Sequence, residues 1–170
     1  MRLDDRLGRD PVRVVVDSQA RTPPSASVIA SSRTAPCIIA TTETAPRERI
    51  AALEKAGAAV WLLPQDPFGR VDLLALASKM AEEGIVHALV EAGPRLQAAF
   101  IQAGLTDRLI VIYAPKTFAD PQALSMLAGA PLWQIENAHR WRVIRHYQVG
   151  DDIVVELERS LRQVPCQPAE

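Results

Sequence analysis

Residues 86–105 read VHALVEAGPRLQAAFIQAGL, and their pattern changes half-way from that of a strand to that of a helix. The apolar run at residues 88–90 has the length of a short buried strand. After Gly93 and Pro94, apolar residues return at helical spacing. Proline suits a first helical turn because its missing N–H would have no partner there, and Gly104 follows the helix where left-handed backbone is favoured. The stretch predicts a strand, a turn and a helix, the repeating unit of α/β folds.

The turn between this strand and helix has the composition of an anion-binding site. A chain that enters a helix through glycine points free backbone N–H groups and the positive end of the helix outward. Glu91 stands at the carboxyl end of the predicted strand, the edge at which open α/β sheets bind ligands. A single Gly-Pro pair is a weak signal, so an ordinary turn in which Gly93 serves only the backbone stays open as the alternative.

The rest of the chain supplies further strands and helices in alternation. Apolar, β-branched runs predict strands at residues 11–16, 37–40, 59–63 and 109–114. Helical spacing and terminal glycines predict helices at residues 46–57, 71–83 and 94–104. Continuous apolar strands joined by helices of this length predict a mostly parallel central sheet flanked by helices.

The last third of the chain changes character. Alternating patterns at residues 141–147 and 153–157 flank Gly150-Asp151-Asp152, which predicts an antiparallel hairpin. The expected fold class is therefore α/β, with a mostly parallel sheet and a C-terminal antiparallel hairpin. We expect a single domain over residues 1–160, followed by a tail at residues 161–170.

Composition narrows the function classes. The chain has 170 residues and a net charge of −1, so no basic surface argues for nucleic acid. No apolar run approaches the roughly 18 residues of a membrane span. The two cysteines form neither a disulfide framework nor a metal-binding spacing. His87, His139 and His146 are far apart in the sequence. We expect a cytoplasmic protein with no metal site, no nucleic-acid partner and no membrane contact.

Several ordered blocks carry a family resemblance: residues 11–18 (PVRVVVDS) with Arg21, 69–73 (GRVDL), 90–96 (VEAGPRL), 102–109 (QAGLTDRL) and 114–116 (APK). Together they closely resemble the reductase domain of the bifunctional riboflavin-biosynthesis deaminase/reductase, over most of residues 4–158. The resemblance implies a dihydrofolate-reductase-like fold and a homodimer. It also implies NADPH-dependent reduction of 5-amino-6-(5-phosphoribosylamino)uracil, a small phosphorylated pyrimidine, to the ribitylamino product.

The resemblance also implies roles for individual residues. Glu91 corresponds to the family's substrate-contacting acid and is the expected catalytic residue. Leu7 and Arg9 are the other expected substrate contacts. The expected cofactor-binding residues are Asp4, Ser18, Gly93, Pro94, Arg95, Leu96, Gln97, Ala98 and Ala99.

Polar residues at two other strand ends have alternative interpretations. Thr41 and Thr42 follow the predicted strand at residues 37–40 and either hold the adenosine end of a cofactor or cap the next turn. Asp17 follows the strand at residues 11–16 and is either a catalytic acid or a turn cap.

The sequence departs from the family in ways that keep other functions open. The family's first strand and the helix after it have no counterpart here, and its D-D-P-x-L-T-V-R block is shortened to residues 4–9 (DDRLGR). The zinc motifs of a deaminase are absent from the sequence, so only the reductase half is in question. Two alternatives follow: a catalytically silent reductase-like domain, or a related NADPH reductase that acts on another heterocycle.

Overall fold

The computed structural model describes residues 10–32, 35–117, 119–120, 122–129 and 138–160. The chain forms two compact units, Met1–His87 and Ala88–Glu170, and each is described by itself. Asp4, Leu7, Arg9 and the predicted tail lie outside the described residues. The expectation of a single domain over residues 1–160 stays a prediction.

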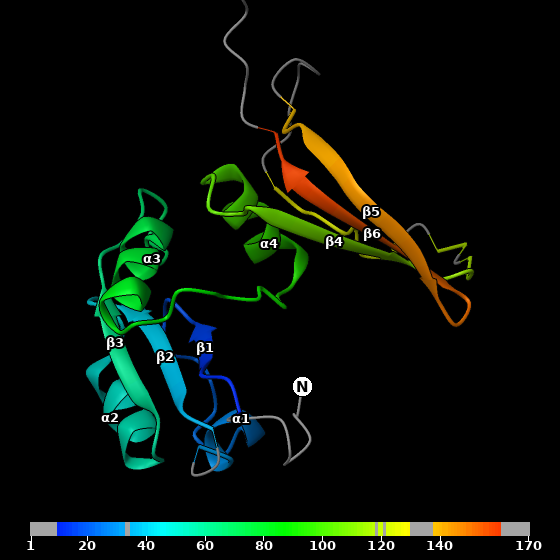
Figure 1. Cartoon of the computed structure of the whole chain (residues 1–170). Helices are drawn as coiled ribbons and strands as arrows, with labels where there is room; N and C mark the ends of the chain where they lie inside the picture. The colour runs from blue at the N-terminus through cyan, green and yellow to red at the C-terminus, as the bar shows by residue number, and fades with distance from the viewer. Residues whose placement is uncertain (1–9, 33–34, 118, 121, 130–137, 161–170) are drawn as a thin grey trace, which may run out of the picture. The chain divides into compact units, whose positions relative to one another are not determined.

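The first unit contains a parallel sheet, as the apolar runs predict (Figure 1). Its strands are β1 (Arg13–Val16), β2 (Cys37–Thr42) and β3 (Ala59–Leu63), in the order β1-β2-β3. Every residue of the central strand β2 is buried, because β2 has a neighbour on each side and helices pack on the sheet. All three predicted strands of this sheet are confirmed, although β2 extends two residues further through Thr41 and Thr42.

Helices in this unit build its core. They are α1 (Ser27–Ala30), α2 (Arg47–Lys55) and α3 (Leu73–Glu82). Cys37 and Ile39, on one face of β2, form a buried cluster with Ile29 of α1 and Leu53 of α2. The helices predicted at residues 46–57 and 71–83 are confirmed with slightly shorter bounds. The four-residue helix α1 is too short for a periodic pattern and was not predicted.

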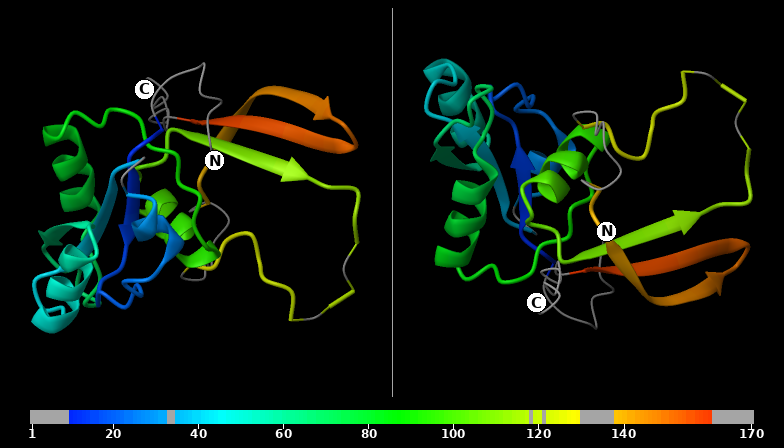
Figure 2. Two further views of the ribbon diagram at one scale, coloured as in Figure 1. Left: turned by 90° about the horizontal axis from the view of Figure 1, so that it is seen from below. Right: turned by 90° about the horizontal axis from the view of Figure 1, so that it is seen from above.

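The second unit consists of a helix and an antiparallel sheet. The helix is α4 (Pro94–Gln102), and the strands are β4 (Arg108–Tyr113), β5 (Trp141–Val149) and β6 (Asp152–Arg159). β6 is central and pairs antiparallel with both neighbours, which can be followed in the two views of Figure 2. Gly150, with φ of 60°, opens the two-residue turn between β5 and β6. The predicted hairpin and the strand predicted at residues 109–114 are confirmed.

The end of α4 is fixed by glycine and by a cation. Gly104 follows the helix with φ of 74°, as its place in the sequence predicts. Arg159, at the end of β6, donates a hydrogen bond from Nη1 to the Gly104 carbonyl. A guanidinium at this position also favours the negative end of the helix dipole. The contact joins the helix to the central strand of the antiparallel sheet.

The strand predicted at residues 88–90 is wrong. The chain from Ile85 to Gly93 runs without helix or strand, and Leu89 is 68% exposed. A strand requires a backbone partner as well as apolar residues, and no ladder among the described residues includes this segment. The parallel sheet is also smaller than predicted, because β4 pairs with β6 rather than with the strands of the first unit.

Within the described part of the chain, no helix combines the length and the apolar character that crossing a bilayer requires.

Candidate functional site

Polar side chains gather where the three parallel strands end. β1, β2 and β3 run in one direction, so the residues after Val16, Thr42 and Leu63 meet at one edge of the sheet. Ligands of open α/β sheets bind at this carboxyl edge. The first unit therefore carries a candidate site built from the loops that follow its strands.

Ser18 links these loops to one another. Its Oγ accepts a hydrogen bond from the Val71 N–H at 3.0 Å, across 53 positions of sequence. Its carbonyl oxygen accepts one from the Thr42 hydroxyl at 2.8 Å. The Ser18 hydroxyl proton has no acceptor among the described residues and is available as a donor. The predicted cofactor-binding serine thus lies at the carboxyl edge and also holds two loops together.

Asp17, next to Ser18, is a turn-capping residue. Its Oδ2 accepts hydrogen bonds from the Thr22 N–H at 2.6 Å and from the Thr22 hydroxyl at 2.7 Å. Ala20, which lies between Asp17 and Thr22 in the sequence, is buried and has φ of 49°, a conformation that non-glycine residues rarely adopt. The structure therefore favours the interpretation of Asp17 as a cap over that of a catalytic acid.

The two threonines that end β2 have different surroundings. Thr42 bonds to the Ser18 carbonyl, as above, and its hydroxyl lies 3.1 Å from that of Thr44. Thr41 lies on the face of β2 shared with Ile39, and its buried Oγ1 has no hydrogen-bond partner among the described residues. Thr42 thus braces the edge, as the capping interpretation expects.

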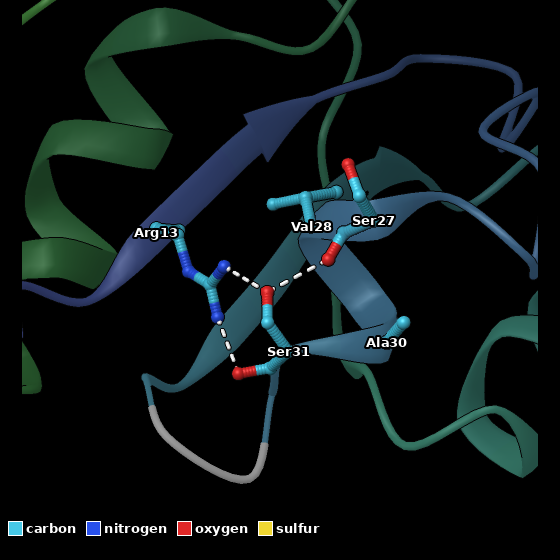
Figure 3. A pocket seen from close by; sticks show the side chains of 5 residues that line it. All are labelled: Arg13, Ser27, Val28, Ala30 and Ser31. Atoms are coloured by element: carbon cyan, nitrogen blue, oxygen red, sulfur yellow. Dashed lines mark hydrogen bonds between the residues drawn. The ribbon is translucent and has the colours of Figure 1, made fainter. Parts of the chain in front are cut away.

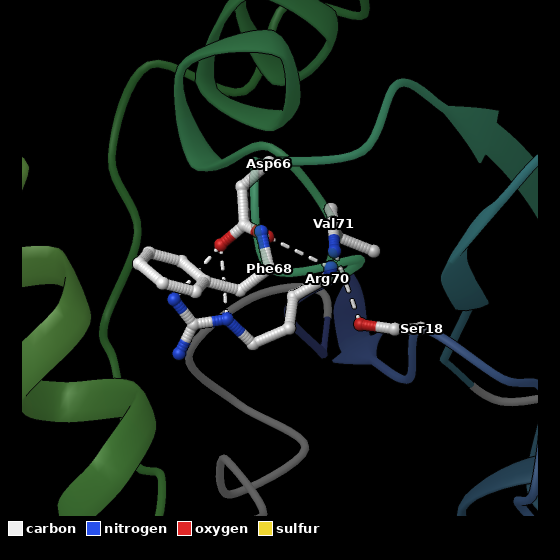
Figure 4. Close-up of polar contacts among 5 residues, drawn as sticks. All are labelled: Ser18, Asp66, Phe68, Arg70 and Val71. Atoms are coloured by element: carbon white, nitrogen blue, oxygen red, sulfur yellow. Dashed lines mark hydrogen bonds and ion pairs between the residues drawn. The ribbon is translucent and has the colours of Figure 1, made fainter.

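The loop after β3 is closed by Asp66, a residue that was not predicted as functional. Its Oδ1 accepts hydrogen bonds from the backbone N–H groups of Phe68 at 2.9 Å and Arg70 at 2.8 Å (Figure 4). Its Oδ2 lies 2.9 Å from Nη2 of Arg70. Desolvation opposes ionisation, but these hydrogen bonds outweigh it and hold the pKa of Asp66 below its ordinary value. The D-P-F-G sequence at residues 66–69 was an available signal, since Asp, Pro and Gly at these spacings favour a turn.

The predicted residues of the second unit lie along the start of α4. Gly93 precedes the helix with φ of −68°, Pro94 is its first residue, and no side chain caps it. The Gln97 side chain donates a hydrogen bond to the Ala92 carbonyl at 2.6 Å, which fixes the turn. Arg95 is exposed. The first N–H groups of α4 therefore have no side-chain cap, and the predicted anion site at this helix start stays a prediction.

The remaining predicted residues of this group differ in exposure. Glu91 is exposed in the segment before Gly93 and belongs to no strand, so the position expected for it at a strand end is wrong. Ala98 is buried, whereas Leu96 and Ala99 are half-buried. The helix brings residues 93–99 together as one continuous element.

A shallow hollow at the opposite edge of the parallel sheet includes none of the predicted residues. It has a volume of about 500 Å³ and is lined by Arg13, Ser27, Val28, Ala30 and Ser31 (Figure 3). Arg13 donates from Nη1 to the Ser31 hydroxyl at 2.6 Å and from Nη2 to the Ser31 carbonyl at 2.9 Å. These bonds tie the start of β1 to the end of α1, so Arg13 has a structural role here.

The residues described in the structure contain no group of three or more His, Cys, Asp or Glu side chains arranged to hold a metal ion.

Comparison with known proteins places the chain in a family. The family model described as the RibD C-terminal domain matches residues 1–155. The chain belongs to the RibD C-terminal domain family. The chain is 36% identical over 155 residues to the 2,5-diamino-6-ribosylamino-4(3H)-pyrimidinone 5′-phosphate reductase of Methanothermobacter thermautotrophicus, covering 91% of this chain and 69% of that one.

Two further members of the RibD group show how much of a longer protein the chain spans. It is 35% identical to the riboflavin biosynthesis protein RibD of Chlamydia muridarum, covering 88% of this chain but only 38% of that protein. The structure of Acinetobacter baumannii RibD aligns with a TM-score of 0.68 at 24% identity, covering 87% of this chain and 37% of that one. The predicted dihydrofolate-reductase-like α/β fold is thereby confirmed.

Proposed function

We propose that this chain is an NADPH-dependent reductase of riboflavin biosynthesis that reduces 5-amino-6-(5-phosphoribosylamino)uracil to its ribitylamino product. The observation that carries the proposal is the family match over residues 1–155, which includes Ser18 and the whole of residues 91–99. The name of the Methanothermobacter relative favours a second candidate substrate, the 2,5-diamino-pyrimidinone 5′-phosphate. Both candidate substrates carry the same phosphoribosylamino group and differ in the pyrimidine ring.

The open start of α4 fits the diphosphate of a dinucleotide. A Cβ built on Gly93 has no neighbouring heavy atom within 4 Å, so the space beside this backbone is free. No side chain caps the helix, and its first N–H groups together with the helix dipole favour a phosphate. Residues 93–99 would hold the diphosphate of NADPH, which supplies the hydride when bound.

The chain's own residues would then orient the substrate and move a proton. The ring-opened form of the ribosyl carbon accepts the hydride, and a proton must reach the adjoining oxygen or nitrogen. Glu91 is exposed and is free of ion pairs among the described residues, so its carboxyl group is available to orient the substrate or to donate that proton. We further propose that the active form is a homodimer.

Two substitutions test this division of labour. Gly93→Val is expected to weaken NADPH binding, because the added side chain would meet a bound phosphate, whereas in the free protein its Cβ has no heavy atom within 4 Å. The change costs some stability, since Gly93 is the N-cap of α4 and valine is unfavourable there. Glu91→Gln is expected to lower turnover more than it lowers cofactor affinity. The measurements are NADPH binding by calorimetry and oxidation of NADPH in the presence of each pyrimidine. Equal losses of turnover and affinity in both variants would contradict the assignment.

The same assays separate the alternatives. A folded chain that binds no NADPH would support the catalytically silent domain. NADPH binding without binding of a ribose 5-phosphate analogue would support a reductase acting on another heterocycle.

A further inference from the structure

The loop after β3 holds two exposed side chains in a fixed arrangement. Phe68 is 80% exposed, and the Arg70 side chain is 58% exposed. The guanidinium carbon of Arg70 lies 5.0 Å from the centre of the Phe68 ring. Figure 4 shows both side chains extending from the loop that Asp66 closes. Because most of the Phe68 ring is exposed to water, burial of its apolar surface contributes little to stability and does not explain its position.

Asp66 fixes this pair and is fully occupied in doing so. It accepts two backbone N–H groups through Oδ1, and Nε and Nη2 of Arg70 through Oδ2, each of these at 2.8–2.9 Å. Its N–H donates to the Arg70 carbonyl at 2.7 Å. The carboxylate therefore has little capacity left for a ligand, whereas Nη1 of Arg70 has no acceptor among the described residues.

The loop lies at the candidate site rather than elsewhere on the surface. The N–H of Val71, the next residue, donates to Ser18 Oγ at 3.0 Å. Gln65, at the start of the loop, donates to the Thr44 hydroxyl after β2. Both contacts join the loop to the carboxyl edge of the parallel sheet, where ligands of such sheets bind.

We propose that Phe68 and Arg70 bind the adenosine 2′-phosphate end of the dinucleotide and select NADPH over NADH. This inference rests on the proposed function. An aromatic face suits an adenine ring, and a guanidinium binds a phosphate through charge-assisted hydrogen bonds. Sites that prefer NADH use a free carboxylate to accept the ribose 2′-hydroxyl. Asp66 is not free for that role, because its oxygens are engaged within the loop.

The test is calorimetric titration of the whole chain with adenosine 2′,5′-bisphosphate and with 5′-AMP, which lacks the 2′-phosphate. Arg70→Gln is expected to weaken binding of the bisphosphate by about tenfold or more, the loss of one charge-assisted contact, and that of 5′-AMP by less than about twofold. Phe68→Ala keeps the Asp66–Arg70 pair and is expected to weaken binding of both probes. Arg47→Gln, at an exposed arginine of α2, is the matched control and is expected to change neither affinity.

The outcomes distinguish this inference from the function on which it rests. If the wild-type chain binds the bisphosphate and Arg70→Gln binds it equally well, the 2′-phosphate assignment is overturned while the reductase proposal stands. Unchanged affinities in Phe68→Ala would overturn the role of the ring. If the wild-type chain binds neither NADPH nor the bisphosphate, both proposals fall. Thermal unfolding of each variant shows whether a loss of affinity reflects a loss of fold.

Discussion

Replacement of Ser18 by alanine tests whether this residue holds the carboxyl edge together. The Val71 N–H donates to Ser18 Oγ at 3.0 Å, and Val71 is only 3% exposed. Removal of the hydroxyl leaves this buried donor without its acceptor. An unsatisfied buried donor costs about 1–3 kcal/mol. We therefore expect Ser18→Ala to lower the free energy of unfolding by about 1–2 kcal/mol, which corresponds to a decrease in Tm of roughly 2–8 °C for a chain of this size.

The assay is urea unfolding without any dinucleotide, so that a role in cofactor binding does not contribute. Ser18→Thr keeps an oxygen acceptor and is expected to restore most of the lost stability. Ser25→Ala is the control, because Ser25 is exposed in the loop before α1 and surface substitutions usually stay within about 0.5 kcal/mol. Hydrogen exchange at the Val71 amide should be faster in Ser18→Ala. A Ser18→Ala variant as stable as Ser25→Ala, with unchanged exchange at Val71, would refute the reasoning.

Two further predictions concern the second unit. Gly104→Ala is expected to destabilise the chain by more than Gly84→Ala. Both glycines have φ near 75°, a conformation that costs alanine about 1–2 kcal/mol. The two differ in their surroundings, because the new Cβ at Gly104 would lie 2.9 Å from Arg159 Nη1, whereas the new Cβ at Gly84 would meet no atom within 4 Å. Urea unfolding measures the difference, and equal losses would argue against the Arg159 contact. The hydrogen bond from Arg145 holds the pKa of Glu156 below its ordinary value despite desolvation. This contribution to stability is therefore present above the unfolded pKa and is lost as the pH falls through the folded one. Glu156→Gln should be less stable than the wild type near pH 7 and equally stable near pH 3, and a difference independent of pH would contradict the assignment.

The regular elements were largely predictable from the sequence, because their signals are local. The strand at residues 59–63 and the start of α4 at Pro94 follow from apolar runs, glycine and proline alone. Residues 88–90 show the limit of such signals. Their composition is that of a strand, but strand formation depends on a partner that the local sequence does not specify.

The candidate site was predictable in part. The family resemblance predicted cofactor roles for Ser18 and residues 93–99, and these roles stay predictions. The contact between Ser18 and Val71 spans 53 positions and has no local signal. Asp66 and Arg70 were missed as a pair because a turn sequence predicts a change of direction, not which side chains the turn leaves exposed. Asp4, Leu7 and Arg9 lie outside the described residues and stay predictions.

The most direct test of the account is titration of the purified chain with NADPH, followed by fluorescence, with NADH as the control. We expect micromolar binding of NADPH and markedly weaker binding of NADH, because only NADPH carries the additional phosphate that we propose Arg70 binds. A folded chain that binds neither dinucleotide would contradict the proposed reductase function.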